Sequence, residues 1–521
     1  MKKILFFLFI FLCIQDAVFA QKNLDNQMRK LIISAVAVND FYADSVNTEK
    51  LVEDAIRGML EKLDPHSQYS TVEETKRLNE PLQGSFDGIG VQFNILDDTL
   101  IVVQTITNGP SEKAGIMPGD RIISVNDTTI AGVKMPQEEI VKRLRGPRKT
   151  HVRLGVLREG LDEVLCFDVI RDKIPLHSVD AAFMITSSTG LVRFSNFAVT
   201  THAEVVAAIE RLKALGMRNL IIDLTQNGGG YLQASAEIAS EFLPEGDMIV
   251  YTNGRAYKQQ EFRSSGGKAF QEGKIIVLVD EYSASASEIL AGAIQDQDRG
   301  LVVGRRTFGK GLVQRPIELP DGSMIRLTIS RYYTPSGRCI QKPYEKGKKQ
   351  DYQMDVINRF NRGELTNVDS IHFPDSLKYQ TLKKGRTVYG GGGIMPDYFV
   401  PLDTTKNTML YRQILAKRIL VNENLRFMAK HRKELLDAYP TFEVFREEFQ
   451  VPEYVVANVV LEGRKSLKEG IAPEEELKTI NNVRRMLKAL IARDLWDMNE
   501  YFAIIYEDDD MVLKALEIIG E

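Results

Sequence analysis

The spacing of apolar side chains changes along the first third of the chain, and each spacing predicts a different structure. Over residues 21–83, apolar residues recur three and four positions apart, which is typical of amphipathic helices. Within this region, Asp64-Pro65-His66-Ser67-Gln68-Tyr69 predicts a turn, because proline ends the preceding helix. Over residues 84–172, short runs alternate apolar and polar positions between turn-forming residues, so we predict a β-rich module with one or two helices.

The rest of the chain shows two further patterns. Over residues 173–404, apolar strands alternate with helical stretches, an order typical of α/β folds. Residues 344–384 interrupt this order with polar, charged and irregular sequence, which indicates a surface insertion. Helical spacing returns over residues 405–521, with one apolar stripe along Val483, Met486, Leu487, Leu490, Ile491 and Leu495. We therefore predict a multidomain α/β protein with helical regions at both ends.

The first residues predict where the protein goes. Two lysines precede an apolar run from Ile4 to Leu12, and Val18-Phe19-Ala20 follows it. This pattern indicates a secretory signal peptide over residues 1–20 that is cleaved after Ala20. The run has about half of the roughly 20 residues that a membrane-spanning helix needs, so a permanent anchor fits less well, as does a lipid on Cys13. We expect an exported protein in the periplasm or cell envelope of a bacterium.

Composition excludes several classes of function. The 521 residues are 44% apolar, which is enough for several hydrophobic cores. Lys and Arg number 67 against 71 Asp and Glu, so no basic excess indicates nucleic acid. The histidines and cysteines lack zinc-binding spacing, and Asp508-Asp509-Asp510 fits a helix cap better than a metal site, so no metal or cofactor is predicted. Cys166 and Cys339 fall in different predicted domains, which does not favour a disulfide.

Three short motifs within residues 84–172 resemble PDZ domains. They are Gly88-Ile89-Gly90-Val91, Gly109-Pro110-Ser111-Glu112-Lys113-Ala114-Gly115-Ile116 and Pro118-Gly119-Asp120-Arg121-Ile122-Ile123-Ser124-Val125-Asn126. The resemblance implies that backbone N–H groups of Gly88, Ile89, Gly90 and Val91 capture a peptide's terminal carboxylate, and that the following strand accepts the peptide as an added strand. The alternative is a domain of this kind that only packs or gates.

A candidate for chemistry lies where the apolar strand 275–279 runs into a helix through Ser283-Ala284-Ser285-Ala286-Ser287-Glu288. At such a junction the first helical N–H groups are unpaired and the helix dipole favours negative charge. A serine there can attack a carbonyl while backbone donors hold the oxyanion. A serine in this position is more commonly a helix cap, so a catalytic interpretation also needs a base.

A lysine downstream is the candidate base. Gly304 to Lys310 imitates a phosphate-binding loop, but Gly311 stands where that loop needs Ser or Thr, so nucleotide binding is not favoured. Burial lowers the pKa of a lysine and lets it accept a proton, which predicts that Phe308 and Val313 enclose Lys310. The alternative of a Ser–His pair is weaker, because neither His177 nor His202 lies in a motif.

Together these segments resemble the carboxyl-terminal processing, or tail-specific, proteases of peptidase family S41. The family signature pairs Ser-Ala-Ser-Ala-Ser-Glu with Thr-Phe-Gly-Lys-Gly and a Gln four residues after the Lys, and the chain reproduces each element. The resemblance implies that Ser285 is the nucleophile, Lys310 its base and Gln314 the residue that orients Lys310. Glu288 corresponds to a family carboxylate near the dyad, although an ordinary helix-surface glutamate is the alternative. A crotonase-like protease core is the fold that the family implies.

Further stretches extend the match. Glycines 228–230 follow Asn227, and the resemblance implies an oxyanion hole made by the N–H of Gly229 or Gly230 together with that of Ala286. Taken alone, these glycines form a tight turn. Thr225 stands where the family has arginine, which puts only the local packing in doubt. Residues 334–338 and 393–397 also match the family but receive no role from the sequence.

The leading interpretation is an exported serine endopeptidase that recognises protein C-termini through the PDZ domain and cleaves through an acyl-enzyme on Ser285. Its partners would be proteins or peptides with accessible, apolar C-termini. Two alternatives remain: a catalytically silent PDZ scaffold or adaptor, and a Ser-Lys amidase or esterase acting on small molecules or cell-wall peptides. Peptide binding at Gly88 to Val91 could also align Ser285 with Lys310. The sequence leaves open the natural substrate and a homo-oligomer or adaptor partner.

Overall fold

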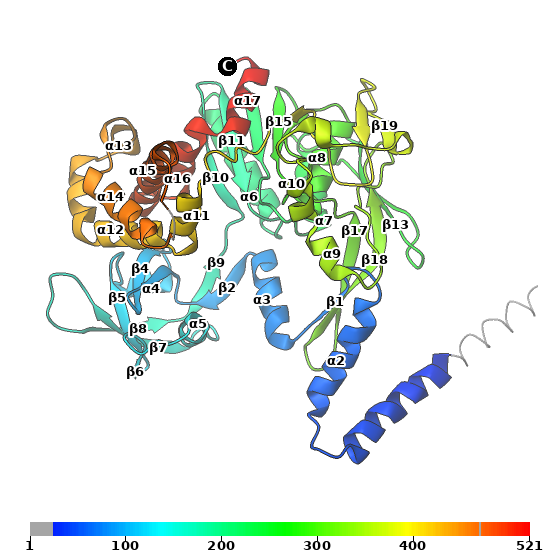
Figure 1. Cartoon of the computed structure of the whole chain (residues 1–521), viewed down its shortest axis with the longest axis horizontal. Helices are drawn as coiled ribbons and strands as arrows, with labels where there is room; N and C mark the ends of the chain where they lie inside the picture. Colours follow the sequence, from blue (N-terminus) through cyan, green and yellow to red (C-terminus); the bar gives the residue numbers. More distant parts are fainter. Residues whose placement is uncertain (1–23, 468–469) are drawn as a thin grey trace, which may run out of the picture. The chain divides into compact units, whose positions relative to one another are not determined.

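The structure, a computed structural model, describes residues 24–467 and 470–521 (Figure 1). The predicted signal peptide therefore lies outside the described residues. The chain forms two compact units. One consists of the described residues up to Thr75 together with Gln314–Thr328 and Tyr344–Gln353, and the other of Lys76–Val313, Ile329–Pro343 and Met354–Glu521.

The first unit is built from helices and short paired strands. Residues 24–41 are helical, and α2 (Thr48–Glu61) follows. The predicted turn leads into β1 (Gln68–Ser70), which pairs antiparallel with the first residues of β18 (Met324–Tyr333). The buried Asp64 carboxylate accepts hydrogen bonds from Ser67 Oγ at 2.5 Å and Thr328 Oγ1 at 2.9 Å. The turn is thus confirmed, and it also holds the two strands together.

The β-rich module in the second unit is a small sheet with its own apolar core. Its strands are β3 (Val91–Leu96), β4 (Thr99–Thr105), β5 (Arg121–Val125), β7 (His151–Leu157) and β8 (Leu165–Ile170), paired in this order. The helix α5 (Gln137–Leu144) packs Ile140 and Leu144 against the sheet. β3 lies at one edge, and Val91, Phe93 and Ile95 face the core.

A six-stranded sheet forms the centre of the second unit. Its order is β10 (Val179–Met184), β11 (Thr189–Phe194), β12 (Asn219–Asp223), β15 (Ile275–Val279), β16 (Leu301–Gly304) and β21 (Tyr398–Phe399), with all pairs after β10–β11 parallel. The unbroken apolar run of β15 is buried throughout, because a central parallel strand is covered on both faces. This arrangement confirms the α/β prediction.

Helices cover both faces of this sheet. α6 (Thr201–Ala214), α7 (Leu232–Ser240) and α8 (Ala286–Asp296) share one buried cluster with Ile275, Val277 and Val279. On the other face, α17 (Asp510–Ile519, red in Figure 1) packs Val512, Ala515 and Ile519 against Ile276 and Leu278. α8 is buried along its whole length, so the residue before it is held firmly.

The C-terminal helices form a second apolar core. They include α11 (Met409–Ala416), α12 (Ile419–Ala438), α14 (Glu453–Arg464), α15 (Pro473–Leu495) and α16 (Met498–Ile505). The predicted stripe is confirmed, because all of its residues belong to this core and only Met486 is partly exposed. Asp509 accepts hydrogen bonds from the Met511 and Val512 N–H groups at 3.0 Å, which confirms it as the cap of α17.

The segment 344–384, which the sequence predicted as a surface insertion, contains short regular elements. It contains α9 (Lys349–Gln353), α10 (Asp355–Asn361) and β19 (Lys378–Gln380), which pairs with β20 (Thr387–Tyr389) just after the segment. Within it, Arg359 and Leu365 are buried. The sequence did not reveal these helices, because five and seven residues are too few to produce a clear apolar period.

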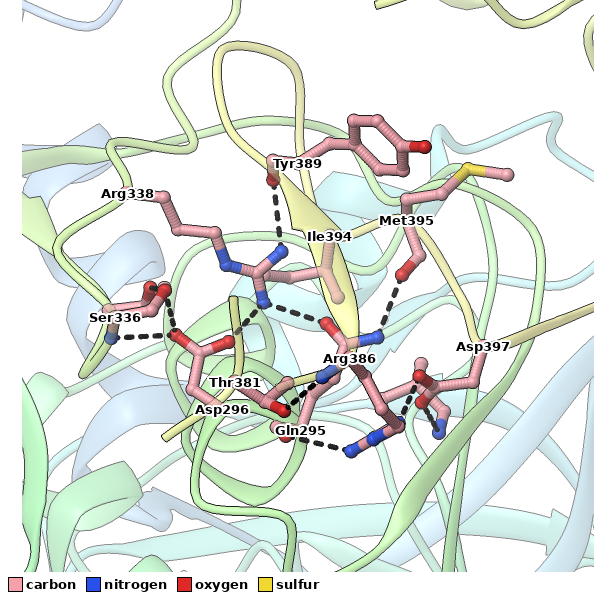
Figure 2. Close-up of polar contacts among 12 residues, drawn as sticks. Gln295, Asp296, Ser336, Arg338, Thr381, Arg386, Tyr389, Ile394, Met395 and Asp397 are labelled. Atoms are coloured by element: carbon pink, nitrogen blue, oxygen red, sulfur yellow. Dashed lines mark hydrogen bonds and ion pairs between the residues drawn. The ribbon is translucent and has the colours of Figure 1, made fainter. Parts of the chain in front are cut away.

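A buried polar network closes the C-terminal end of α8 (Figure 2). Arg338 donates to Asp296 Oδ1 at 2.6 Å and to Gln295 Oε1 at 2.7 Å. Neither side chain of the Arg338–Asp296 pair is exposed. Ser336 donates both its N–H and its Oγ proton to Asp296 Oδ2. The stretch 334–338, which the sequence left without a role, therefore anchors α8.

The second stretch without a role, 393–397, joins the same network. Gln295 Nε2 donates to the Met395 carbonyl at 2.9 Å, and Arg386 Nη2 donates to the Gln295 carbonyl at 2.9 Å. Arg386 also forms an ion pair with Asp397 (Figure 2). Both stretches thus position α8 from its far end.

We predict that Arg338→Leu lowers the free energy of unfolding by about 3–5 kcal/mol, because it leaves the Asp296 carboxylate buried without its partner. Urea unfolding followed by circular dichroism measures this loss. The double variant Arg338→Leu/Asp296→Asn should recover part of it, since the unpaired charge is then gone. A loss below about 1 kcal/mol in the single variant would contradict the account.

Candidate active site

Ser285 occupies a strained turn between β15 and α8. It is the N-cap of α8 with φ 58° and ψ −112°. An ordinary cap residue has β-region angles, and a non-glycine residue with positive φ costs about 1–3 kcal/mol. A sharp strand-to-helix turn of this kind presents a serine hydroxyl outward. The cap interpretation therefore holds for the position but does not explain its conformation.

The three serines of this turn differ in what their hydroxyl groups do. Ser283 Oγ donates to the Leu224 carbonyl at 2.8 Å, and Ser287 Oγ donates to the Asn227 carbonyl at 2.9 Å. Both serines are completely buried, whereas Ser285 is half-buried. Over residues 24–467 and 470–521, no carbonyl accepts a hydrogen bond from Ser285 Oγ. Ser285 is therefore the serine whose hydroxyl proton is available for chemistry.

The Glu288 carboxylate connects the serine turn to the loop that carries Lys310. Glu288 is completely buried, so the alternative of a surface glutamate is wrong. It accepts hydrogen bonds from four donors: Ser285 N at 2.8 Å, Thr307 Oγ1 at 2.6 Å, Gly309 N at 2.7 Å and Lys310 N at 2.9 Å. Burial raises the pKa of Glu288, although these donors oppose that effect. Its carboxylate fixes both loops at once.

Tyr332 provides a second connection, which the sequence did not reveal. Its side chain is buried, and its Oη lies 3.0 Å from the Ser285 carbonyl oxygen and 2.5 Å from the Lys310 carbonyl oxygen. Since a tyrosine hydroxyl has one proton, it is shared between the two carbonyls. The one sequence signal was its position just before the stretch 334–338.

The surroundings of Lys310 differ from the prediction. Lys310, Phe308 and Val313 are all half-buried, so the lysine is not fully enclosed. The Phe308 ring instead makes a cation–π contact with a second lysine, Lys342, whose Nζ lies 3.7 Å from the ring centroid. Burial lowers the pKa of Lys342, while its ion pair with Asp355 at 3.0 Å opposes that effect. The loop thus lies beside another cation that sequence reasoning missed.

Glycines bring a backbone loop against Ser285. A Cβ on Gly229 would lie 2.8 Å from Ser285 Cβ and 2.9 Å from Ala286 N, so only glycine fits. The Gly229 N–H donates to Asn227 Oδ1 at 2.9 Å. Within the described part of the chain, the N–H groups of Gly230 and Ala286 have no acceptor. These two N–H groups, rather than that of Gly229, are therefore the candidates for the oxyanion hole.

Asn227 holds this loop and the serine turn together. Its side-chain Nδ2 donates to the Phe194 carbonyl at 2.8 Å, and its own carbonyl accepts from Ala284 N at 3.0 Å. Thr225, at the position where the family has arginine, accepts a hydrogen bond from Arg193 Nη1 at 2.8 Å. An arginine from the neighbouring strand therefore packs against the residue that departs from the family pattern.

The part of the predicted insertion that lies in the second unit braces the loop that carries Lys310. The buried Arg359 guanidinium donates to the Thr307 carbonyl at 3.0 Å and to the Arg306 carbonyl at 2.5 Å. Glu364 forms ion pairs with the side chains of Arg306 and Arg359. Burial, aided by the nearby Arg306 charge, lowers the pKa of Arg359 to about 10. No spacing in the sequence could have indicated these contacts.

Gln314 belongs to the first unit, so its predicted role toward Lys310 stays a prediction. Its Nε2 donates to Thr328 Oγ1 at 3.4 Å, and Thr328 in turn donates to Asp64 at 2.9 Å. The predicted turn at Asp64 is therefore connected with Gln314 through Thr328.

In the loop Gly88 to Val91, which is predicted to bind the peptide carboxylate, two N–H groups point in the same direction. The Ile89 carbonyl accepts from Ser111 N at 3.0 Å, and the Gly90 carbonyl accepts from Ile106 N at 3.0 Å. In a trans peptide the C=O of one residue and the N–H of the next point in opposite directions. The N–H groups of Gly90 and Val91 therefore both point away from residues 106–111. Gly90, with φ 73°, permits this arrangement, which is suited to an anion.

Over residues 24–467 and 470–521, no group of histidine, cysteine, aspartate and glutamate side chains is arranged to hold a metal. Across the same residues, no helix has both the length and the apolar character needed to span a membrane.

Three family models match separate parts of the chain. Peptidase family S41 matches residues 188–354, the PDZ domain matches residues 101–158, and a family of unknown function (DUF8443) matches residues 410–497. The first match contains Ser285 and Lys310, and the third covers most of the C-terminal helices.

Curated relatives give a consistent result. A carboxy-terminal-processing protease of Bartonella bacilliformis is 36% identical over 305 residues, which are 58% of this chain and 69% of the relative. The carboxy-terminal processing protease CtpB of Bacillus subtilis is 34% identical over 351 residues, covering 66% and 72%. CtpA of the same organism is 32% identical over 379 residues, covering 69% and 79%. The chain therefore belongs to the carboxy-terminal-processing proteases of peptidase family S41, which are serine-type hydrolases, and it carries a PDZ domain.

Proposed function

We propose that this protease is a serine endopeptidase that recognises protein C-termini through its PDZ domain and cleaves with a Ser285–Lys310 dyad. The observation that carries the proposal is the strained turn of Ser285, joined to the Lys310 loop by Glu288. Substrates are proteins or peptides with accessible, apolar C-termini. The parallel sheet with α6, α7 and α8 on one face supports a crotonase-like core.

The proposed reaction uses the Ser285 hydroxyl, the Lys310 amine and two backbone N–H groups. Uncharged Lys310 Nζ accepts the hydroxyl proton as Ser285 Oγ attacks the scissile carbonyl carbon. The Gly230 and Ala286 N–H groups stabilise the oxyanion that forms. Lys310 then gives its proton to the leaving amine, and an ester between Ser285 and the substrate acyl group remains. Water hydrolyses this ester with Lys310 as base, while Gln314 orients the lysine.

We also propose that the protein is exported and that residues 1–20 are removed after Ala20. Support comes from the two lysines and the apolar run at the N-terminus. The mass of the mature protein from an envelope fraction identifies its first residue.

The dyad is tested with an unfolded protein that ends in an apolar tail, with products identified by mass. We predict that Ser285→Ala and Lys310→Ala each lower kcat/KM by at least about 1,000-fold, because each removes a group that acts in the reaction. The exposed residues Ser265 and Lys258 give matched controls, and Ser265→Ala and Lys258→Met should cleave like the parent. Equal cleavage by either dyad variant would contradict the proposal.

The positioning role of Glu288 is tested with Glu288→Gln. Each Glu288 oxygen accepts two donors, and the amide group of glutamine would face two of them without an acceptor. We predict that kcat falls about 100-fold while KM changes less than about threefold, because the loops shift but the tail still binds. A variant that keeps the parent kcat would show that the contact is only structural.

The peptide loop is tested in the Ser285→Ala background by fluorescence anisotropy with a labelled tail peptide. Gly90→Ala disfavours φ 73° and places a Cβ 3.0 Å from Ile174 Cδ1, so we predict at least about tenfold weaker binding. Gly119→Ala is the matched control, because Gly119 has φ 93° in the same domain and open space around it. Equal loss in both variants would mean that domain stability, not the loop, sets the affinity.

A further inference from the structure

The outer face of the β3–β4 hairpin packs on the C-terminal helices. Leu96, Ile101 and Val103 share a buried cluster with Leu425 of α12, and Val421 of the same helix packs against it. In Figure 1 the helix α12 lies beside β4. The face of the PDZ sheet that points away from its own core is therefore covered by another domain.

Polar contacts extend this interface along the hairpin. Gln104 Nε2 donates to the carbonyls of Arg493 at 2.8 Å and Trp496 at 3.1 Å. Near the other end, Arg418 Nη2 donates to Asn94 Oδ1 at 3.0 Å. The contact thus reaches β3, which is the edge strand next to the predicted peptide loop.

The alternation of side chains determines what an added strand would meet. Gln92 pairs with Gln104 and Asn94 pairs with Ile101, so these β3 residues lie on the face that contacts the helices. A peptide whose carboxylate lies at Gly88 to Val91 would run antiparallel to β3 and alternate in the same way. If its last side chain faces the PDZ core, the third residue before the last lies on the helical side, beside Asn94.

Arg418 is held at this place by a strained backbone. It lies between α11 and α12 with φ 56°, a conformation that costs an arginine about 1–2 kcal/mol and that glycine adopts freely. Its side chain is exposed. The hydrogen bond to Asn94 uses one of five guanidinium N–H donors, so the others can bind a second acceptor.

The neighbouring cations already have acidic partners. Arg426 pairs with Asp97 and Glu423. The pKa of Glu462 is lowered mainly by its hydrogen bond with Lys465, and the charges of Lys417 and Arg426 add to that effect. Over the described residues, by contrast, no carboxylate lies within ion-pair distance of Arg418. Arg418 is therefore the cation at the edge of β3 that still lacks a negative partner.

We infer that the helical domain forms the second wall of the peptide groove and that Arg418 selects tails with an aspartate or glutamate three residues before the C-terminal one. This inference rests on the proposed capture of C-termini by the PDZ loop. A charged hydrogen bond from a guanidinium to a carboxylate is stronger than one to an amide of the same shape. The domain of unknown function thus contributes to the choice of substrate.

The test uses the mature chain with Ser285→Ala and labelled tail peptides that differ only at this position, with Glu, Gln or Lys. We expect the Glu peptide to bind three- to tenfold more tightly than the Gln peptide. Arg418→Gly should abolish this difference without unfolding the chain, because glycine relieves the strained backbone. Arg418→Glu should make the Lys peptide the tightest.

Arg426→Ala is the matched control, since it removes a cation of the same interface that already has acidic partners, and it should keep the preference for Glu. Equal binding of the Glu and Gln peptides by the parent, or a preference that survives in Arg418→Gly, would overturn the inference while leaving capture by the PDZ loop intact. Failure of the parent to bind any tail would overturn both.

Discussion

The buried carboxylate of Glu288, at the start of α8, is bound by four hydrogen-bond donors and by no cation among them. Burying a charge is costly unless its hydrogen bonds are satisfied, and Glu288 meets this condition only when the serine turn and the lysine loop are both in place. The contact therefore couples the conformations of two segments more than 20 positions apart in the chain. The strained angles of Ser285 can persist because this contact and the Tyr332 hydroxyl over-determine them.

The rest of the second unit keeps α8 from moving. Its sides are buried against the central sheet, and its C-terminal end is fixed by the Arg338–Asp296 pair. The lysine loop is braced separately by Arg359. The packing on the sheet and the Arg338–Asp296 pair hold α8, and Arg359 holds the lysine loop. A small displacement of one segment is therefore opposed by the contacts of the others. This rigidity is what catalysis by positioned groups requires.

Local patterns predicted most of the elements, and the family motifs pointed to the two segments that Glu288 joins. The apolar run 275–279 predicted a buried strand, the spacing after residue 405 predicted helices, and the motifs around Ser285 and Lys310 placed both on loops that the structure joins. The roles of Asn227, Tyr332 and Arg359 were missed, because each acts through contacts with residues distant in sequence. A buried arginine in a polar segment looks like any surface arginine until the fold brings carbonyl groups to it. The same reason hid the contact between Arg418 and β3.

Trapping of the acyl-enzyme tests the central claim most directly. The mature protein would be mixed with an activated ester of an apolar peptide, quenched in acid within milliseconds and analysed by peptide mass spectrometry. The account predicts an ester on Ser285 in the parent and none in Lys310→Ala. An ester on another residue, or full occupancy of Ser285 without Lys310, would contradict it.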